Sequence, residues 1–195
     1  MPTNPAPPDR REMGARLRAI RRQHRLTLKA LSARSGVALS TLSKMELGQI
    51  AVSYEKFAAV ARALAVDIAQ LFDARAAAPS APAPTFVHAT IAGAPGYDTG
   101  RYDYRLLAAD YPARQMTPMH GRISARRRDE FAEFIHHAGQ EFVTVLAGSV
   151  RIEFETGEAV VLKRHESAYF DSGVGHVYLS TGRGDAEVLV VMTER

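Results

Sequence analysis

The chain contains no cysteine among its 195 residues, so disulfide bonds and thiolate metal sites are excluded. It has no apolar run close to the roughly 18 residues that a membrane-spanning helix needs. Its first ten residues, MPTNPAPPDR, are rich in proline and lack the apolar core of a signal peptide. These absences predict a cytoplasmic protein that does not associate with membranes. The length leaves room for one or two domains, each with its own core.

Charge is spread unevenly along the chain. Residues 9–73 carry 12 Lys and Arg against 6 Asp and Glu, a net charge of +6, whereas residues 86–195 carry 12 against 15, a net charge of −3. A basic segment suits a polyanionic partner, and an acidic segment does not. The difference predicts two domains with different partners, of which only the first suits nucleic acid.

A proline- and alanine-rich segment over 74–85 separates two kinds of sequence pattern. Its composition cannot build a core, so we interpret it as an extended linker. Before it, helical periodicity over 10–73 predicts an all-α domain of five helices, which include 28–34 and 39–46. After it, short alternating runs over 86–195, separated by Gly, Pro and Asp, predict an all-β sandwich or barrel.

The stretch from Leu26 to Gly48, LTLKALSARSGVALSTLSKMELG, has the pattern of two short helices joined by a tight turn. Gly36 falls in the turn, where glycine adopts a positive φ without steric penalty. A helix-turn-helix of this kind presents its second helix to the major groove of DNA. The motif therefore predicts sequence-specific binding to a double-stranded DNA operator. Apolar residues fall where the two crossed helices would meet, at Leu28, Leu31, Val37, Leu42 and Met45.

The outward positions of the second helix are expected to contact DNA. Serine and threonine hydroxyls bind bases or phosphates, Leu39 can touch a thymine methyl, and Lys44 reaches phosphate or guanine. Lys29 and Gln49 are better placed for backbone phosphates, which position the protein without specifying the sequence. The predicted DNA-contacting residues are Lys29, Leu39, Ser40, Thr41, Ser43, Lys44 and Gln49.

Residues 17–72 resemble the DNA-binding domain of the XRE regulators, the lambda repressor and Cro-like family. SGVALSTLSKMELG is similar to the GVS..TLS..E.G core of that family, and SYEKFAAVARALAVDIAQLF is similar to its ending. Two positions depart from the pattern: Ser32 stands where alanine is usual, and Ala38 stands where Ser or Thr usually caps the recognition helix. The resemblance implies that Glu46 ties the end of this helix to neighbouring backbone or to a basic side chain.

Histidine and glutamate side chains recur in the second half of the chain, at His136, His137, Glu141 and His176. These residue types ligate Zn²⁺, Fe²⁺, Mn²⁺ or Ni²⁺. Two histidines and one carboxylate on strands that face a barrel interior would form an open metal site. A divalent metal is therefore one expectation for this half of the chain.

The segments around these residues resemble the two motifs of the cupin domain, a double-stranded β-helix barrel. EFIHHAGQEFVTVLAGSVRIEF is similar to the first motif, since Glu141 and Gly148 keep its E(X)6G spacing, and HESAYFDSGVGHVYLS is similar to the second. The resemblance covers 104–193, and the chain as a whole resembles the XRE-cupin transcription factors. It implies three metal ligands, His137, Glu141 and His176, where four are usual, because Ile135 takes the place of one histidine.

Two interpretations of this site stay open. The three side chains bind a divalent metal that supports ligand binding, or they are metal-free: they then line a pocket for a small molecule or are merely hydrogen-bonded remnants of the motif. Arg122 and Tyr169 are further candidates for an effector pocket that takes an anionic or aromatic ligand. The SAYF strand does not show which of its alternate residues face inward, so Phe170 could do so in place of Tyr169. Three other histidines are expected to have no role in the site: His120 as a hydrogen-bonded bystander, and His136 and His165 on the surface.

Together these patterns predict a DNA-binding transcriptional regulator whose cupin domain senses a small-molecule effector and holds a homodimer together. A monomeric motif would bind DNA weakly, whereas two motifs can read half-sites about one helical turn apart. One alternative is a metal-dependent cupin enzyme, a dioxygenase or isomerase, fused to a DNA-binding module. Another is an antitoxin-like or phage-type repressor in which the β domain only dimerises.

Overall fold

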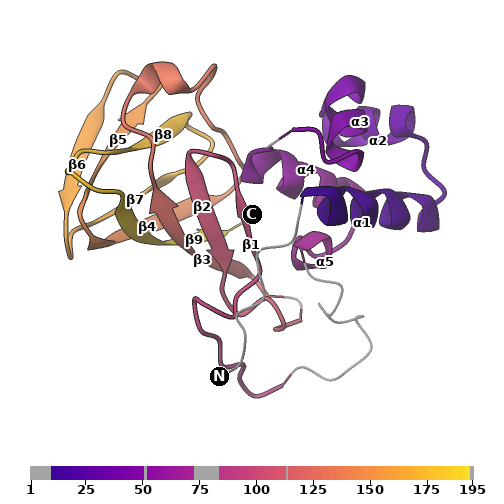
Figure 1. Cartoon of the computed structure of the whole chain (residues 1–195), viewed down its shortest axis with the longest axis horizontal. Coiled ribbons are helices and arrows are strands. Elements are labelled where there is room, and N and C mark those ends of the chain that lie inside the picture. The colour runs from indigo at the N-terminus through magenta and orange to yellow at the C-terminus, as the bar shows by residue number, and fades with distance from the viewer. Residues whose placement is uncertain (1–9, 51, 73–83, 113, 194–195) are drawn as a thin grey trace. The chain divides into compact units, whose positions relative to one another are not determined.

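The computed structural model describes residues 10–50, 52–72, 84–112 and 114–193 (Figure 1). They form two units: a helical unit that runs to Thr99 and includes the stretch from Ala108, and a β unit made of Gly100–Leu107 and the chain from Arg114. Most of the predicted linker over 74–85 lies outside the described residues. None of the described helices is long and apolar enough to cross a membrane.

The helical unit has the predicted helices, and local signals in the sequence account for their ends. The Thr27 hydroxyl accepts a hydrogen bond from the Ala30 N–H at 3.1 Å and so starts the second helix, whose C-cap is Gly36 with a φ of 72°. The Asp67 carboxylate accepts from the Ala69 N–H at 2.8 Å and starts the fifth. The helices are α1 (Arg10–Gln23), α2 (Leu28–Ser35), α3 (Leu39–Glu46), α4 (Tyr54–Leu64) and α5 (Ala69–Phe72). Their core includes Leu17, Leu31, Leu42, Val60, Leu64, Leu71 and Phe72.

Helix α1 packs very closely against the end of α3. A Cβ at Gly14 would lie 2.4 Å from the Met45 carbonyl oxygen, so only glycine permits this approach. Helix α3 ends at Glu46, Leu47 takes the capping position, and Gly48 follows with a φ of 64°. Helix α3 is thereby held along one side by α1, while its residues Leu39, Ser40 and Lys44 reach solvent.

Helix α3 begins without a side-chain cap. Ala38 occupies the N-cap position with a φ of −55° and a ψ of 140°, and its methyl group cannot accept a hydrogen bond. We expect Ala38→Ser to raise the free energy of unfolding of the helical unit by about 1 kcal/mol, because the new hydroxyl accepts from a free N–H of the first turn. Denaturant unfolding followed by circular dichroism measures the change.

Ala33→Ser is the matched control for this substitution. Ala33 is an exposed position within α2, where serine is a weaker helix former than alanine, so a slight loss of stability is expected. Equal free energies of unfolding for Ala38→Ser and the parent chain would contradict the expectation that a serine cap stabilises α3.

The helical unit also takes in a segment that follows the proline- and alanine-rich stretch. Tyr97, in the short strand β1 (Gly96–Asp98), is almost fully buried. Its ring stacks on Phe72 with the centroids 5.1 Å apart and lies 6.1 Å from Phe57. This aromatic contact joins α4, α5 and the segment around Tyr97 into one core.

The β unit is built from antiparallel strands in two sheets. One sheet contains β2, β3, β9, β4 and β7 in that order, and the other contains β6, β5 and β8. Alternate residues face the interior, and the buried ones include Val143, Val145, Ile152, Val188 and Val190. The strands are β2 (Tyr102–Leu106), β3 (Met116–Ile123), β4 (Gln140–Ala147), β5 (Ser149–Phe154), β6 (Ala159–Lys163), β7 (Ser167–Asp171), β8 (His176–Ser180) and β9 (Ala186–Thr193).

Candidate functional site

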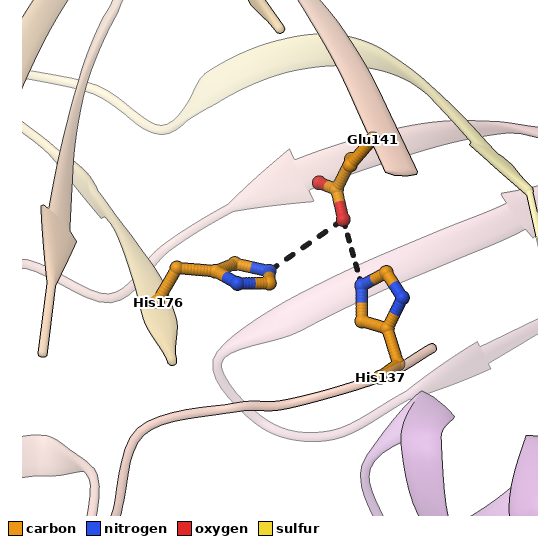
Figure 2. Close-up of side chains that lie close together, drawn as sticks. All are labelled: His137, Glu141 and His176. Carbon is orange, nitrogen blue, oxygen red and sulfur yellow. Dashed lines mark hydrogen bonds and ion pairs between the residues drawn. The ribbon is translucent and has the colours of Figure 1, made fainter. Parts of the chain in front are cut away.

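Three predicted ligands of the β unit meet in its interior. Glu141 lies on β4, His176 begins β8, and His137 lies in the segment that leads into β4. The Nε2 atom of His137 is 2.8 Å from Oε2 of Glu141, and the Nε2 atom of His176 is 3.5 Å from the same oxygen. All three side chains are at most 6% exposed. Figure 2 shows both imidazoles directed at this one carboxylate.

Backbone contacts fix the positions of the two histidines. The His137 N–H donates to the Ser172 carbonyl at 3.0 Å, and His176 exchanges backbone hydrogen bonds with Ile135. Between His137 and Glu141 the chain turns at Gly139, with a φ of 94°, where a Cβ would lie 2.1 Å from the Thr193 carbonyl oxygen. Glycine is therefore required at the turn that brings the His137 imidazole back over the Glu141 carboxylate.

The hydrogen bonds of His176 identify the ring nitrogen that is available to a cation. Its Nδ1 atom lies 2.9 Å from the Val174 carbonyl oxygen, and since a carbonyl only accepts, Nδ1 carries a proton. In the neutral ring, Nε2 then offers a lone pair toward a carboxylate oxygen that also only accepts. A proton or a metal ion is needed between the two atoms, so the arrangement fits a divalent cation.

The second oxygen of Glu141 has a different partner. The Tyr178 hydroxyl, buried in the β unit, donates a hydrogen bond to Oε1. Burial raises the pKa of Glu141, but hydrogen bonds and charge interactions with His137 and His176 outweigh it and lower the pKa to about 2. Burial and the neighbouring Glu141 carboxylate raise the pKa of Tyr178 well above its ordinary value. Glu141 is therefore ionised and Tyr178 protonated at neutral pH.

The lowered pKa of Glu141 predicts a pH dependence of stability in metal-free protein. Because the folded pKa of about 2 lies below the ordinary glutamate pKa of 4.5, Glu141 contributes stability above pH 4.5. This contribution is expected to disappear as the pH falls from 4.5 toward 2. Thermal unfolding in the presence of a chelator should therefore show a steeper acid loss in the parent chain than in Glu141→Gln. Parallel pH profiles of the two proteins would contradict this expectation.

Two residues predicted for the effector pocket lie away from the cluster, and their contact with an effector stays a prediction. Tyr169 is 63% exposed and donates a hydrogen bond to Gln140, because its cross-strand partner is the outward-facing Phe142. Phe170 faces inward instead, with its ring centroid 4.9 Å from that of His176. The Arg122 guanidinium is more than half exposed and lies 3.7 Å from Asp185.

The three histidines that are predicted to have no role in the site lie where the sequence predicts. His120 is 3.4 Å from Glu187 through its Nε2 atom. His136 is largely exposed and pairs with Glu155, and His165 occupies an exposed turn with a φ of 71°. None of the three belongs to the His137, Glu141 and His176 cluster.

The predicted DNA-contacting residues lie on or beside α3. Side chains in the first turn of α3 reach solvent, with Leu39 49% exposed and Ser40 also exposed. Thr41 and Ser43 are half-buried, whereas Lys29, Lys44 and Gln49 are exposed. These positions are available to a ligand of the helical unit, and their contact with DNA stays a prediction.

A buried ion pair supports α3 at its C-terminal end, away from the exposed first turn. The Arg21 guanidinium donates two hydrogen bonds to the Glu46 carboxylate, at 2.5 and 2.9 Å, and a third to the Leu26 carbonyl at 2.7 Å. The hydrogen bond to Glu46 raises the pKa of Arg21. Glu46 thus has the structural role that the sequence comparison implied, and Arg21 is its partner.

Family models match two separate parts of the chain. A helix-turn-helix domain model matches residues 12–73, and a cupin domain model matches residues 128–192. The chain therefore carries an N-terminal helix-turn-helix domain and a C-terminal cupin domain. The predicted combination of an all-α helix-turn-helix domain and an all-β cupin domain is confirmed.

Solved structures with this fold include a transcriptional regulator and an enzyme. The HTH_3 family transcriptional regulator from Vibrio cholerae is 16% identical, with a TM-score of 0.60 over 96% of this chain and 97% of that one. The hydroxypropylphosphonic acid epoxidase from S. wedmorenis is 20% identical, with a TM-score of 0.52 over 94% and 98%. A second enzyme structure, the iron(II) form of HppE, is 20% identical, with a TM-score of 0.51 over 95% of this chain and 100% of that one. No curated protein matches the chain.

Proposed function

We propose that this chain is a sequence-specific transcriptional regulator whose cupin domain senses a small-molecule effector. The observation that carries the DNA half is the exposed first turn of α3 on a tightly supported helix-turn-helix domain. A supported helix whose outer face carries Ser40, Thr41 and Lys44 matches what the major groove accepts. The net charge of +6 over residues 9–73 adds attraction to phosphate.

The effector half rests on the buried cluster in the cupin domain. His137, Glu141 and His176 would hold a divalent ion through the Nε2, Oε2 and Nε2 atoms that converge there. Such an ion, when bound, supplies a Lewis acid that attracts an anionic or electron-rich effector. Phe170 packs on His176 and Phe154 packs on Phe170, so apolar rings border the cluster and exclude water from it.

A homodimer through the cupin domain is supported by an apolar outer face of its larger sheet. Phe142 on β4 and Tyr169 on β7 are cross-strand partners that are 37% and 63% exposed, and Met116 on β3 is 57% exposed. Burial of such a face stabilises an assembly, and two chains would present two recognition helices to adjacent half-sites. Light scattering at micromolar concentration is expected to give twice the chain mass, and the mass of one chain would refute the dimer.

Selection of binding sites from a random DNA pool tests the proposed regulator. The full chain is expected to enrich a two-fold symmetric sequence with half-sites about 10 base pairs apart. Its affinity for that sequence should exceed its affinity for random DNA at least about 10³-fold. Enrichment of no sequence over the starting pool would overturn the assignment.

A metal-dependent cupin enzyme is the second candidate, and the buried His₂Glu set favours it. Two histidines and one carboxylate with open positions are the ligand set of non-haem iron oxygenases, and an epoxidase is among the structures with this fold. Metal analysis with an oxygen-consumption screen distinguishes the two functions. Stoichiometric iron and turnover that is lost in His137→Ala would favour the enzyme. Metal-dependent DNA affinity without turnover would favour the regulator.

A further inference from the structure

The two oxygens of the Glu141 carboxylate have separate sets of partners. Oε2 faces Nε2 of His137 at 2.8 Å and Nε2 of His176 at 3.5 Å. Oε1 accepts the hydrogen bond from the Tyr178 hydroxyl. The carboxylate is therefore turned so that one oxygen faces the cluster and the other faces a tyrosine.

Tyr178 is itself held rigidly in the β unit. Its backbone N–H donates to the Tyr102 hydroxyl at 2.8 Å, and that hydroxyl donates to the Tyr178 carbonyl at 3.0 Å. On its other edge β8 pairs with β5, where Ile152 is the cross-strand partner of Tyr178. A strand held on both edges leaves the Tyr178 hydroxyl little freedom, so its hydrogen bond fixes the orientation of the Glu141 carboxylate.

Strand alternation places Tyr178 on the same face of β8 as His176. The ring centroids of the two residues are 6.0 Å apart, and both side chains are 2% exposed. The cupin pattern offers four ligands, whereas this chain has Ile135 in place of one histidine. With three ligands in place of four, the orientation of the Glu141 carboxylate has a larger influence on metal affinity and geometry.

We propose that Tyr178 is a positioning residue that makes Glu141 a one-oxygen ligand. It engages Oε1 and leaves Oε2 to join the two imidazole nitrogens, so that three protein atoms converge on the cation. This inference rests on the proposed metal site at His137, Glu141 and His176. Hydrogen-bonding partners of ligating side chains typically contribute 10- to 100-fold to metal affinity.

Titration of the metal-free full chain with Co²⁺, followed by visible absorption and competition with a chelator, tests the proposal. Tyr178→Phe keeps the ring and removes only the hydroxyl, so its Co²⁺ affinity is expected to fall about 10- to 100-fold. Its Co²⁺ spectrum is expected to change as well, because Glu141 can then offer both oxygens. A merely structural role of Tyr178 would leave the spectrum of the bound Co²⁺ unchanged.

Tyr169→Phe is the matched control in the same unit. It also removes one tyrosine hydroxyl that donates to a side-chain oxygen, that of Gln140, on the outer face. Its Co²⁺ affinity and spectrum are expected to equal those of the parent chain. Equal affinity and spectrum in Tyr178→Phe would overturn the positioning role while leaving the metal site intact.

The same titration separates this inference from the metal site on which it rests. A parent chain that binds no Co²⁺ would overturn both. If Tyr178→Phe does not fold, Tyr102→Phe decides, because it frees the Tyr178 backbone and should lower Co²⁺ affinity in the same direction. Unchanged Co²⁺ affinity in folded Tyr102→Phe would then overturn the proposal.

Discussion

Glu46→Ala is expected to destabilise the helical unit by about 3–5 kcal/mol, because it leaves the Arg21 guanidinium buried without its partner. The Arg21 and Glu46 side chains are only 10% and 6% exposed, so water cannot replace the lost hydrogen bonds. A loss of this size approaches the total stability of a small domain. Denaturant unfolding followed by the helical circular dichroism signal measures it.

Glu12→Ala is the matched control, because it also removes a glutamate that faces an arginine of α1. The Glu12 carboxylate lies 3.9 Å from Arg16 and is 64% exposed, so its loss is expected to cost less than about 1 kcal/mol. The double variant Arg21→Met, Glu46→Met removes both charges and should be more stable than Glu46→Ala. Equal unfolding free energies for Glu46→Ala and Glu12→Ala would contradict the structural role of this pair.

Ser40→Ala combined with Thr41→Ala is expected to lower operator affinity about 5- to 150-fold. Each lost hydrogen bond is worth about 0.5–1.5 kcal/mol, and both hydroxyls lie in the first turn of α3. Binding to random DNA should change little, because phosphate contacts and charge remain. Fluorescence anisotropy with the selected operator and with a scrambled duplex measures both affinities.

Lys29→Ala provides the contrasting variant. It should weaken binding to operator and scrambled DNA alike and reduce the salt slope by about 1, because it removes a phosphate contact. Lys163→Ala, an exposed lysine on β6, should change neither affinity. Operator affinity that survives in the Ser40 and Thr41 double variant would show that α3 does not read the site through these hydroxyls.

The helix-turn-helix domain could be predicted from the sequence because its determinants are local. Gly36 and the apolar spacing around Leu31 and Leu42 fix two short helices within one stretch of chain. The sequence assigns Glu46 a structural role but does not identify its partner. Arg21 lies on a different helix, α1, which carries several other arginines. The choice among those arginines depends on how α1 crosses α3.

The cupin cluster could be predicted only in part. His137, Glu141 and His176 were found because they match motif positions, and the structure brings them together. The sequence left the inward-facing residue of SAYF open between Tyr169 and Phe170, because the two aromatic residues are adjacent and only the register with β4 decides between them.

Tyr178 was missed although it lies two residues after His176, a spacing that puts both on one face of a strand. This spacing is the signal in the sequence that could have found it. The hydroxyl of Tyr102, which holds the Tyr178 backbone, comes from 76 residues away. No local pattern predicts such a contact.

The stacking of Tyr97 on Phe72 has a consequence for tolerance to insertion. Phe72 and Tyr97 lie on either side of the proline- and alanine-rich stretch and contact each other, so this contact would also close a longer stretch. Doubling such a length costs about 0.6 kcal/mol. The stretch is therefore a place where an epitope or a protease site can be added without unfolding the helix-turn-helix domain. After cleavage there, the contacts of Tyr97 with Phe72 and Phe57 would still hold the segment around Tyr97 to the helical unit.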